Sequence, residues 1–281
     1  MPITIKSHAK LNLFLKVISK REDGYHNLRT LFVLISLHDN ITIKKTDTEI
    51  AISCDDASVP CDETNLAHRA ASLFFQASGV KSGASINIEK RIPVAAGLGG
   101  GSSNAAATLT GLNNIFGNPL TEEKLHEIAT SIGADVPFFL HNKAAYAEGI
   151  GNIFSGTPTL PELYFVLIYP NFFVSAKFAY ENLKLNDIND EYKKALPISF
   201  SDTDEVVDIL YNSLEASVAS EYPLIDDIKS ALKKSGAAGA LMSGSGPTVF
   251  GIYPDINAAK SALTELTKSM PDYNIILTNS I

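Results

Sequence analysis

Residues 93–109 of this 281-residue chain read PVAAGLGGGSSNAAATL, with four glycines among the five positions 97–101. An alternating stretch at 84–90 precedes them and predicts a strand, and apolar residues at helical spacing follow them. Glycines let backbone N–H groups turn inward with no Cβ in the way, and a helix start adds unsatisfied N–H groups and a positive dipole end. The strand–loop–helix pattern therefore predicts an anion cradle suited to phosphate groups.

The named phosphate and hydrolase motifs do not fit this loop. Ser102 stands where a G-x-G-x-x-G motif starting at Gly97 needs its last glycine, and no lysine follows the glycines as a P-loop requires. The G-x-S-x-G pattern of a hydrolase elbow is absent as well. We predict a phosphate loop of another kind, with an ordinary flexible turn as the alternative. Ser102 and Ser103 either cap the following helix or reach a phosphate or Mg²⁺.

Upstream of the loop, the pattern predicts strands and helices in alternation. Residues 8–18 alternate and predict a half-buried strand; a turn at Asp23 and Gly24 joins it to a second strand at 28–37. Further strands are predicted at 41–44 and 50–54, and a helix at 65–77 that ends at Gly79. Beyond the loop helix, Thr121 is placed to cap a helix that Gly133 closes.

Downstream, the glycine and prolines of residues 155–162 predict a domain boundary, which gives domains 1–157 and 158–281. Strands are predicted at 163–169, 238–242, 248–253 and 273–278. Helices are predicted at 176–183, 202–217, 223–234 and 256–269. The order strand–helix–strand–strand–helix–strand is that of a ferredoxin-like fold, with extra helices in its first crossover.

Composition excludes several classes of protein. The chain is 45% hydrophobic and 19% charged, which is incompatible with intrinsic disorder. Lys and Arg number 23 against 31 Asp and Glu, so the net charge of −8 argues against general nucleic-acid binding. Cys54 and Cys61 cannot build a disulfide scaffold or, with His68, a structural zinc site. The N-terminus has no secretory h-region, and the apolar runs are of strand length, so we expect a soluble, cytoplasmic protein without membrane segments.

Two ionisable residues are candidates for chemistry. Asp135 follows Gly133 and precedes an apolar stretch, where an aspartate either caps the next turn or acts as a buried proton acceptor. Lys10 lies on the strand face opposite the leucine stripe, beside Asn12, and is either a solvated lysine or a partner for a carboxylate. A lysine near a carboxylate keeps it ionised and stabilises developing negative charge.

Three motifs occur in order along the chain: AKLNLFL at 9–15, PVAAGLGGGSSNAA at 93–106 and SGSGPTVFG at 243–251. This set resembles the GHMP superfamily of small-molecule kinases. The additional stretches DGYHNLRTLF at 23–32 and GADVPFF at 133–139 resemble the branch whose substrate is 4-diphosphocytidyl-2-C-methyl-D-erythritol. The resemblance covers nearly the whole chain. It implies an α+β fold of two domains, an N-terminal ribosomal-S5-like domain and a ferredoxin-like C-terminal domain.

The resemblance also implies the reaction and its residues. ATP, with Mg²⁺, phosphorylates the 2-hydroxyl of the cytidine diphosphate substrate in non-mevalonate isoprenoid biosynthesis, with Lys10 and Asp135 as catalytic residues. Substrate-binding positions are Asn12, Tyr25, His26 and, as an aromatic after Val174 and Ser175, Tyr180. Ala95 departs from the glycine that relatives often carry. The implied ATP loop consists of Pro93, Val94, Ala95, Ala96, Gly97, Leu98, Gly99, Gly100, Gly101, Ser102 and Ser103.

Two other functions remain open at this point. A kinase of the same superfamily that acts on another small alcohol, such as homoserine or mevalonate, shares the loop motif. Tyr25 and His26 favour the cytidine substrate, because a nucleobase pocket needs an aromatic face and hydrogen bonds to the base edge. A nucleotide-binding regulator without catalysis is the third possibility, and the presence of both Lys10 and Asp135 argues against it.

Overall fold

The computed structural model describes residues 1–183 and 196–281. Two long strands lead the chain, β1 (Ile3–Lys20) and β2 (His26–Thr46), joined by a turn in which Gly24 has a φ of +86°. The first strand and the turn were predicted. The strands predicted at 28–37 and 41–44 form one strand instead, because Leu37–Asn40 stays extended and Asn40 pairs with Glu89. Pairing to a neighbouring strand outweighs the turn preference of these residues.

The chain divides into two compact units. Unit 1 consists of Met1–Ala9, Leu37–Val94 and Gly99–Asn142, and unit 2 of Lys10–Ser36, Ala95–Leu98 and Lys143–Ile281. The glycine loop therefore contributes residues to both units. We describe each unit by itself, and the domain division at 157 and 158 stays a prediction.

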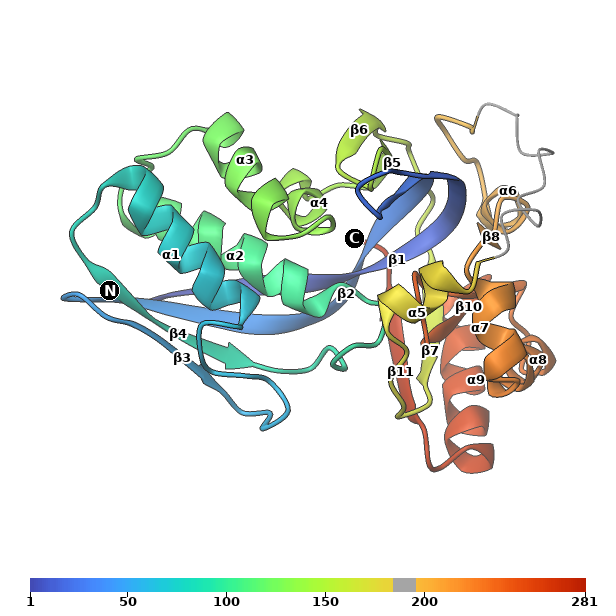
Figure 1. The fold of residues 1–281 in the computed structure, drawn as a ribbon. Helices are drawn as coiled ribbons and strands as arrows, with labels where there is room; N and C mark the ends of the chain where they lie inside the picture. The colour runs from blue at the N-terminus through green and yellow to red at the C-terminus, as the bar shows by residue number, and fades with distance from the viewer. Residues whose placement is uncertain (184–195) are drawn as a thin grey trace. The chain divides into compact units, whose positions relative to one another are not determined.

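Unit 1 is a sheet covered by helices (Figure 1). The second half of β2 pairs antiparallel with β4 (Gly83–Glu89), and β3 (Ile50–Cys54) pairs parallel to β4. Its helices are α1 (Leu66–Ser78), α2 (Gly100–Ile115), α3 (Glu122–Ile132) and α4 (Val136–His141). The predicted ends are confirmed: Gly79 closes α1 in a left-handed conformation, and Thr121 caps α3 by accepting a hydrogen bond from the Lys124 N–H.

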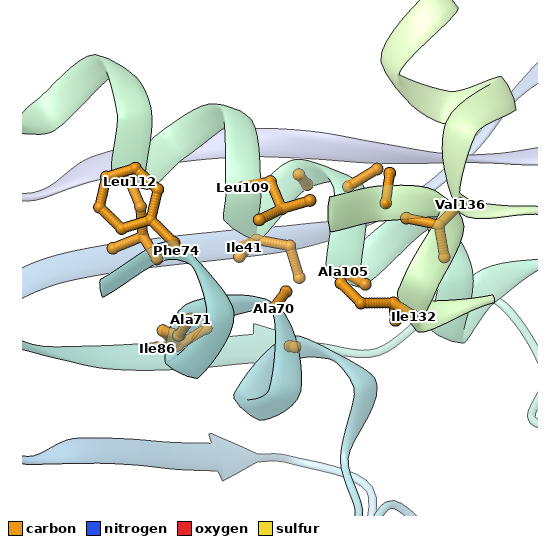
Figure 2. Close-up of a cluster of buried hydrophobic side chains, with 14 of the residues drawn as sticks. Ile41, Ala70, Ala71, Phe74, Ile86, Ala105, Leu109, Leu112, Ile132 and Val136 are labelled. Carbon is orange, nitrogen blue, oxygen red and sulfur yellow. The ribbon is translucent and has the colours of Figure 1, made fainter. Parts of the chain in front are cut away.

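The core of unit 1 lies between this sheet and the helices (Figure 2). Ile41 and Ile86 come from the sheet, Phe74 from α1, and Leu109 from α2, and all four are fully buried. The small side chains of Ala70 in α1 and Ala105 in α2 belong to the same buried cluster. The core thus fixes α2 on the sheet. The first turn of α2, which directly follows the glycine loop, is fixed with it.

Unit 2 contains a four-stranded antiparallel sheet in the order β11-β7-β10-β9. These strands are β7 (Tyr164–Tyr169), β9 (Gly239–Met242), β10 (Val249–Tyr253) and β11 (Asn274–Asn279). Val166 and Ile168 of β7 share a core with α8 (Leu224–Lys234) and α9 (Ile256–Ser269). In chain order the sheet reads 4-1-3-2, which is the ferredoxin-like arrangement that the sequence predicts.

The helix predicted at 202–217 is wrong. The segment forms α6 (Thr203–Val207), the short strand β8 (Tyr211–Asn212) and α7 (Glu215–Glu221). Tyr211 and Asn212 pair in parallel with Phe14 and Leu15 of β1, so sheet pairing interrupts the helical pattern. Besides β8, three further elements were not predicted: α4 and the strands β5 (Ala145–Glu148) and β6 (Ile153–Gly156), with β5 paired to Thr30–Phe32 of β2.

The remaining predicted helix of unit 2 is α5 (Ala176–Glu181), which begins after Ser175. The Ser175 hydroxyl accepts a hydrogen bond from the Phe178 N–H and so caps it. Within residues 1–183 and 196–281, no helix combines the length and apolarity that crossing a membrane requires.

Candidate functional site

The glycine loop has left-handed backbone at alternate positions. Ala95, Gly97 and Gly99 have φ values of +55°, +78° and +72°. Gly97 and Gly99 adopt this conformation without strain, because glycine has no Cβ. Ala95 does not, so the one departure from the expected glycine lies at a position whose conformation favours glycine. Alanine rarely adopts this conformation on its own, so the surrounding structure stabilises it at Ala95.

In unit 2, the turn between β9 and β10 packs directly on the loop. A Cβ added to Gly97 would lie 2.4 Å from the Ser243 carbonyl oxygen and 2.9 Å from that of Gly246. The Ser243 hydroxyl donates to the Gly97 carbonyl at 3.2 Å. The first half of the loop and the SGSGP motif thus meet at backbone distance, and only glycine fits at position 97.

Lys10 belongs to the same cluster of unit 2. Its backbone N–H donates to the Leu98 carbonyl at 3.0 Å, which ties β1 to the loop. A Cβ added to Gly244 would lie 3.3 Å from the Lys10 ammonium nitrogen. The three motifs that the sequence singles out are therefore neighbours at this point: Lys10 from the first, Gly97 from the second and Gly244 from the third.

A buried chain of hydrogen bonds aims the Lys10 ammonium. Nζ donates to Asn12 Oδ1 at 2.6 Å, Asn12 Nδ2 donates to Thr30 Oγ1 at 2.8 Å, and the Thr30 hydroxyl donates to the Phe14 carbonyl at 2.7 Å. Lys10 is 4% exposed and Thr30 fully buried. The lysine is thus not the solvated strand residue that was one of its two interpretations, because a buried cation with a fixed acceptor is positioned rather than hydrated.

Asn212 supports the turn that faces Lys10. Its Nδ2 donates to the carbonyls of Met242 and Gly244, both at 2.8 Å, and its Oδ1 accepts from the Leu214 N–H. Asn212 itself is fixed by the pairing of β8 with β1. This residue was missed by sequence reasoning because its segment was assigned to a helix.

In unit 1, α2 begins at the glycine cluster. Gly99 is its N-cap, and no side chain makes a capping bond there. The interpretation of Ser102 and Ser103 as helix caps is therefore wrong: both lie inside the first turn. Ser103 is 2% exposed and accepts a 2.7 Å hydrogen bond from Ser7, so its hydroxyl is engaged within the unit. The positive end of the helix dipole at the start of α2 favours an anion.

Asp135 also lies in unit 1, at the N-cap position of α4. It makes no side-chain capping bond to that helix, and its φ and ψ of −84° and −15° are helical rather than the extended values of a capping residue. The capping interpretation of Asp135 thus lacks the hydrogen bond that defines it. Val136 and Phe138 behind it are fully buried, which fixes the short helix that carries the carboxylate.

The predicted nucleobase residues all belong to unit 2. His26, the first residue of β2, stacks on Tyr180 of α5, with ring centroids 5.1 Å apart and an interplanar angle of 24°. Tyr25 is 59% exposed. The turn that presents it is fixed by Asp23, whose carboxylate accepts from the Arg21 guanidinium and from the Tyr25 N–H. Tyr25, His26 and Tyr180 thus offer aromatic faces from two elements that are far apart in sequence.

The surroundings of His26 favour its neutral imidazole. Burial lowers its pKa below the ordinary value of 6.5, because the charged form loses hydration, and the nearby Lys20 lowers the pKa further. A neutral imidazole carries one donor and one acceptor. That pairing suits the edge of a nucleobase, which also presents both.

No protein cage for a metal exists in the described ranges: no three His, Cys, Asp or Glu side chains gather where they could hold one ion. This arrangement is compatible with Mg²⁺, which commonly binds through substrate phosphates and one or two carboxylates while keeping several waters.

Comparison with known proteins agrees with these observations. Residues 65–143 match the family "GHMP kinases N terminal domain" and residues 193–272 match "GHMP kinases C terminal". The chain is 43% identical over 268 residues to a 4-diphosphocytidyl-2-C-methyl-D-erythritol kinase of Geobacter metallireducens, a match that covers 95% of each chain.

Solved structures share the fold. A crystal structure of 4-(cytidine 5'-diphospho)-2C-methyl-D-erythritol kinase is 32% identical, covers 99% of both chains and superposes with a TM-score of 0.84. A homoserine kinase from Cytophaga hutchinsonii has a TM-score of 0.73 at 19% identity and covers 100% of this chain and 94% of its own. The latter likeness concerns the fold alone.

Proposed function

Since the chain belongs to the 4-diphosphocytidyl-2-C-methyl-D-erythritol kinases of the GHMP superfamily, we propose that it phosphorylates that compound at the 2-hydroxyl with ATP. The product would serve the non-mevalonate route to isoprenoid precursors. The observation that carries the proposal is the 43% identity over 95% of both chains with a kinase of this name. The stacking of His26 on Tyr180 supports a nucleobase-containing substrate rather than a small aliphatic alcohol.

The reaction exchanges one P–O bond for another. The acceptor hydroxyl oxygen bonds to the γ-phosphorus while the bond from that phosphorus to the β–γ bridging oxygen breaks, and ADP leaves. Phosphoryl transfer relies on positioning and on electrostatic stabilisation more than on covalent chemistry by the protein. We assign the nucleotide phosphates to the loop 93–103, where left-handed backbone and the start of α2 favour an anion.

Asp135 and Lys10 are assigned the two remaining roles. Asp135 takes the proton that the acceptor hydroxyl releases, from its position at the start of α4. Lys10, held by Asn12, stabilises the negative charge on the transferring phosphoryl group. Mg²⁺, when bound with ATP, would neutralise charge on the phosphates.

The substrate side is assigned to unit 2. Tyr25 and Tyr180 provide aromatic surface for the cytosine ring, and His26 hydrogen-bonds its edge. Asn12 contacts the substrate while it orients Lys10. We further propose a cytoplasmic location, since both substrates are soluble phosphates, and expect neither a nucleic-acid nor a membrane partner.

A panel of acceptors tests the proposal. The purified chain is incubated with ATP and Mg²⁺ and, separately, the cytidine diphosphate substrate, homoserine or mevalonate. We expect ADP formation only with the cytidine substrate, mass gain of one phosphoryl group, and a ³¹P signal that couples to the 2-position. Turnover of homoserine or mevalonate without turnover of the cytidine substrate would contradict the proposal. ADP formation with none of them would favour a regulator.

A further inference from the structure

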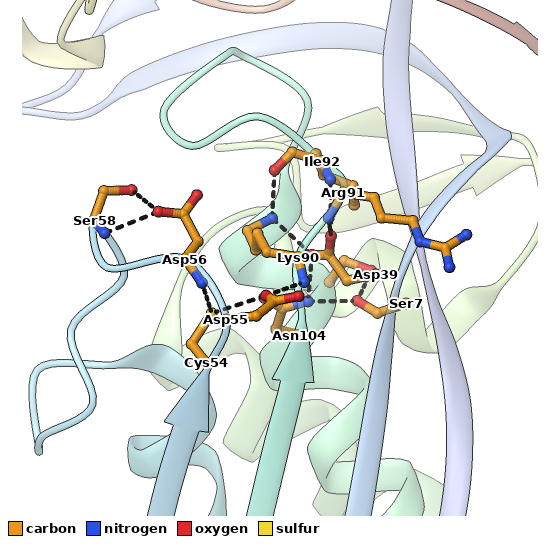
Figure 3. Close-up of polar contacts among 11 residues, drawn as sticks. Ser7, Asp39, Cys54, Asp55, Asp56, Ser58, Lys90, Arg91, Ile92 and Asn104 are labelled. Atoms are coloured by element: carbon orange, nitrogen blue, oxygen red, sulfur yellow. Dashed lines mark hydrogen bonds and ion pairs between the residues drawn. The ribbon is translucent and has the colours of Figure 1, made fainter.

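The carboxylate of Asp39, in unit 1, is fully buried and accepts hydrogen bonds at both oxygens (Figure 3). Oδ1 accepts from the backbone N–H groups of Arg91 and Ile92, each at 2.8 Å. Oδ2 accepts from the Lys90 ammonium at 2.7 Å and from Asn104 Nδ2 at 2.9 Å. One side chain of β2 thus collects four donors, and all four lie beside the glycine loop.

These donors come from the two ends of that loop. Lys90, Arg91 and Ile92 follow β4 and lead into Pro93, where the loop begins. Asn104 lies in the first turns of α2, just after Ser103, where the loop ends. Asp39 therefore ties the entry of the loop to its exit. Closing a loop by fixed ends removes conformational freedom from the segment between them.

The bonds around Asp39 extend to other parts of the unit. Lys90 Nζ also donates to the Ile92 carbonyl at 2.5 Å, and Asn104 Nδ2 donates to Ser7 Oγ at 2.9 Å. Ser7 in turn donates to Ser103, a residue of the loop itself. A Cβ on Gly100 would lie 3.2 Å from Lys90 Nζ, so the ammonium lies against the first residue of α2.

We propose that Asp39 is a positioning residue for ATP binding, because it fixes both ends of the phosphate loop before the nucleotide arrives. The inference rests on the proposed function of that loop. The charge of Asp39 matters as well as its hydrogen bonds. A buried lysine at the helix start requires a buried carboxylate, since an unpaired charge in that position is strongly unfavourable. A phosphate loop that is already ordered in the free protein loses less conformational entropy when ATP binds.

Asp39→Asn tests this role with little change of volume. The amide replaces an acceptor oxygen by an NH₂ group, which cannot accept from both Lys90 and Asn104, and it leaves the Lys90 charge unpaired. We expect the KM for ATP to rise between about tenfold and 100-fold, which corresponds to one or two tenfold steps of affinity. The KM for the cytidine substrate should stay within about twofold, well below one tenfold step of affinity.

Asn104→Ala is the milder companion variant, which keeps the ion pair and removes one bond to Asp39, together with the bond to Ser7. One hydrogen bond corresponds to roughly a two- to tenfold rise in the KM for ATP. This variant keeps the test decisive if Asp39→Asn fails to fold. Ile86→Ala is the matched control: Ile86 is fully buried in the same unit, and its side chain packs in the hydrophobic core.

Hydrogen–deuterium exchange of the ligand-free protein separates the two proposals. We expect faster exchange in residues 90–104 of Asp39→Asn and Asn104→Ala than in wild type, and no such local change in Ile86→Ala. Unchanged exchange in that segment, or an equal change in Ile86→Ala, would overturn the positioning role whatever the enzyme phosphorylates. Absence of kinase activity in wild type would instead overturn the proposed function and leave the exchange result standing.

Discussion

The ring of His26 stacks on the ring of Tyr180, with the centroids 5.1 Å apart. One residue opens β2 and the other lies in α5, so the contact depends on the fold of unit 2 and not on local sequence. Stacking restrains both rings and leaves the imidazole edge available for hydrogen bonds. Preorganised aromatic groups bind a planar base with little loss of side-chain entropy.

Replacing Tyr180 by alanine should weaken substrate binding selectively. Stacking of a base on an aromatic ring contributes about 1–3 kcal/mol, which corresponds to roughly a 5- to 150-fold rise in the KM for the cytidine substrate. The KM for ATP should not change. Tyr180→Phe keeps the aromatic face and serves as the control. Steady-state kinetics with each substrate varied decide the matter; equal rises of both KM values would assign Tyr180 a structural role.

The stability of the protein should depend on the protonation of His26. Its pKa in the folded state is lowered by burial, so below about pH 6.5 the unfolded chain binds this proton more readily than the folded chain does. The contribution of neutral His26 to the free energy of unfolding is therefore complete above about pH 6.5. It is lost as the pH falls from there toward the lowered pKa.

The variant His26→Gln removes this one titration. We expect its melting temperature to fall less than that of wild type when the pH is lowered from about 7.5 to about 5, the interval in which histidine titrates. Thermal melts across that interval measure the difference. Parallel curves for the two proteins would show that His26 does not carry the dependence.

Sequence reasoning succeeded where local pattern and long-range packing agree. The ends of α1 at Asn65 and Gly79 and of α3 at Thr121 follow from capping chemistry that is local to each helix. The ferredoxin-like order of strands follows from periodicity alone. The segment that contains Asn212 failed, because a short strand paired with β1 leaves no periodic signal in its own sequence.

The supporting residues of the site were less accessible to prediction. Thr30 and Asp39 lie on β2 and resemble ordinary strand or turn residues; their roles arise from partners 16 and 53 positions away in sequence. A polar residue such as Thr30 inside a run of strand-forming apolar residues is the one signal that could have found it, since a buried hydroxyl must have a partner. Asp39 falls between the strands predicted at 28–37 and 41–44, so its place in the pattern gave no sign of its partners.

Thr30→Val should alter the position of the Lys10 ammonium indirectly, through Asn12. Valine has nearly the shape of threonine, but it removes the buried hydroxyl that accepts from Asn12 Nδ2 and donates to the Phe14 carbonyl. The free energy of unfolding should fall by about 1–3 kcal/mol, and kcat by about tenfold as Asn12 loses its orientation. Thr30→Ser retains the hydroxyl and should keep most of kcat. A similar loss of kcat in both variants would attribute the effect to packing instead.

Gly97→Ala should damage ATP binding through a backbone collision. The added Cβ would lie 2.4 Å from the Ser243 carbonyl oxygen, and a φ of +78° adds strain. Gly117→Ala is the control, since Gly117 has a φ of +83° with no atom within 4 Å of the added Cβ. Both should lose about 1 kcal/mol or more of unfolding free energy through strain. Only Gly97→Ala should raise the KM for ATP, and calorimetric titration with ATP checks this; normal affinity in a folded variant would contradict the loop assignment.

Asp135→Asn separates proton transfer from structure. The amide keeps the shape of the side chain and a capping oxygen, and Asn caps a helix about as well as Asp. A purely structural Asp135 would therefore tolerate the change. A general base cannot, because the amide does not take the proton that the acceptor hydroxyl releases, and such bases contribute about 10²–10⁴-fold.

We expect kcat of Asp135→Asn to fall within that range of about 10²–10⁴-fold. Both KM values and the melting temperature should remain close to those of wild type, since the amide keeps the shape of the side chain and Asn is tolerated at this helix position about as well as Asp. Steady-state kinetics with both substrates saturating, beside a thermal melt, measure these quantities. A folded variant with kcat within about threefold of wild type would falsify the assignment, because so small a loss lies far below what a general base contributes. If the melting temperature of the variant fell together with kcat, Asp135 would instead have a structural role in unit 1, where Val136 and Phe138 anchor the same short helix.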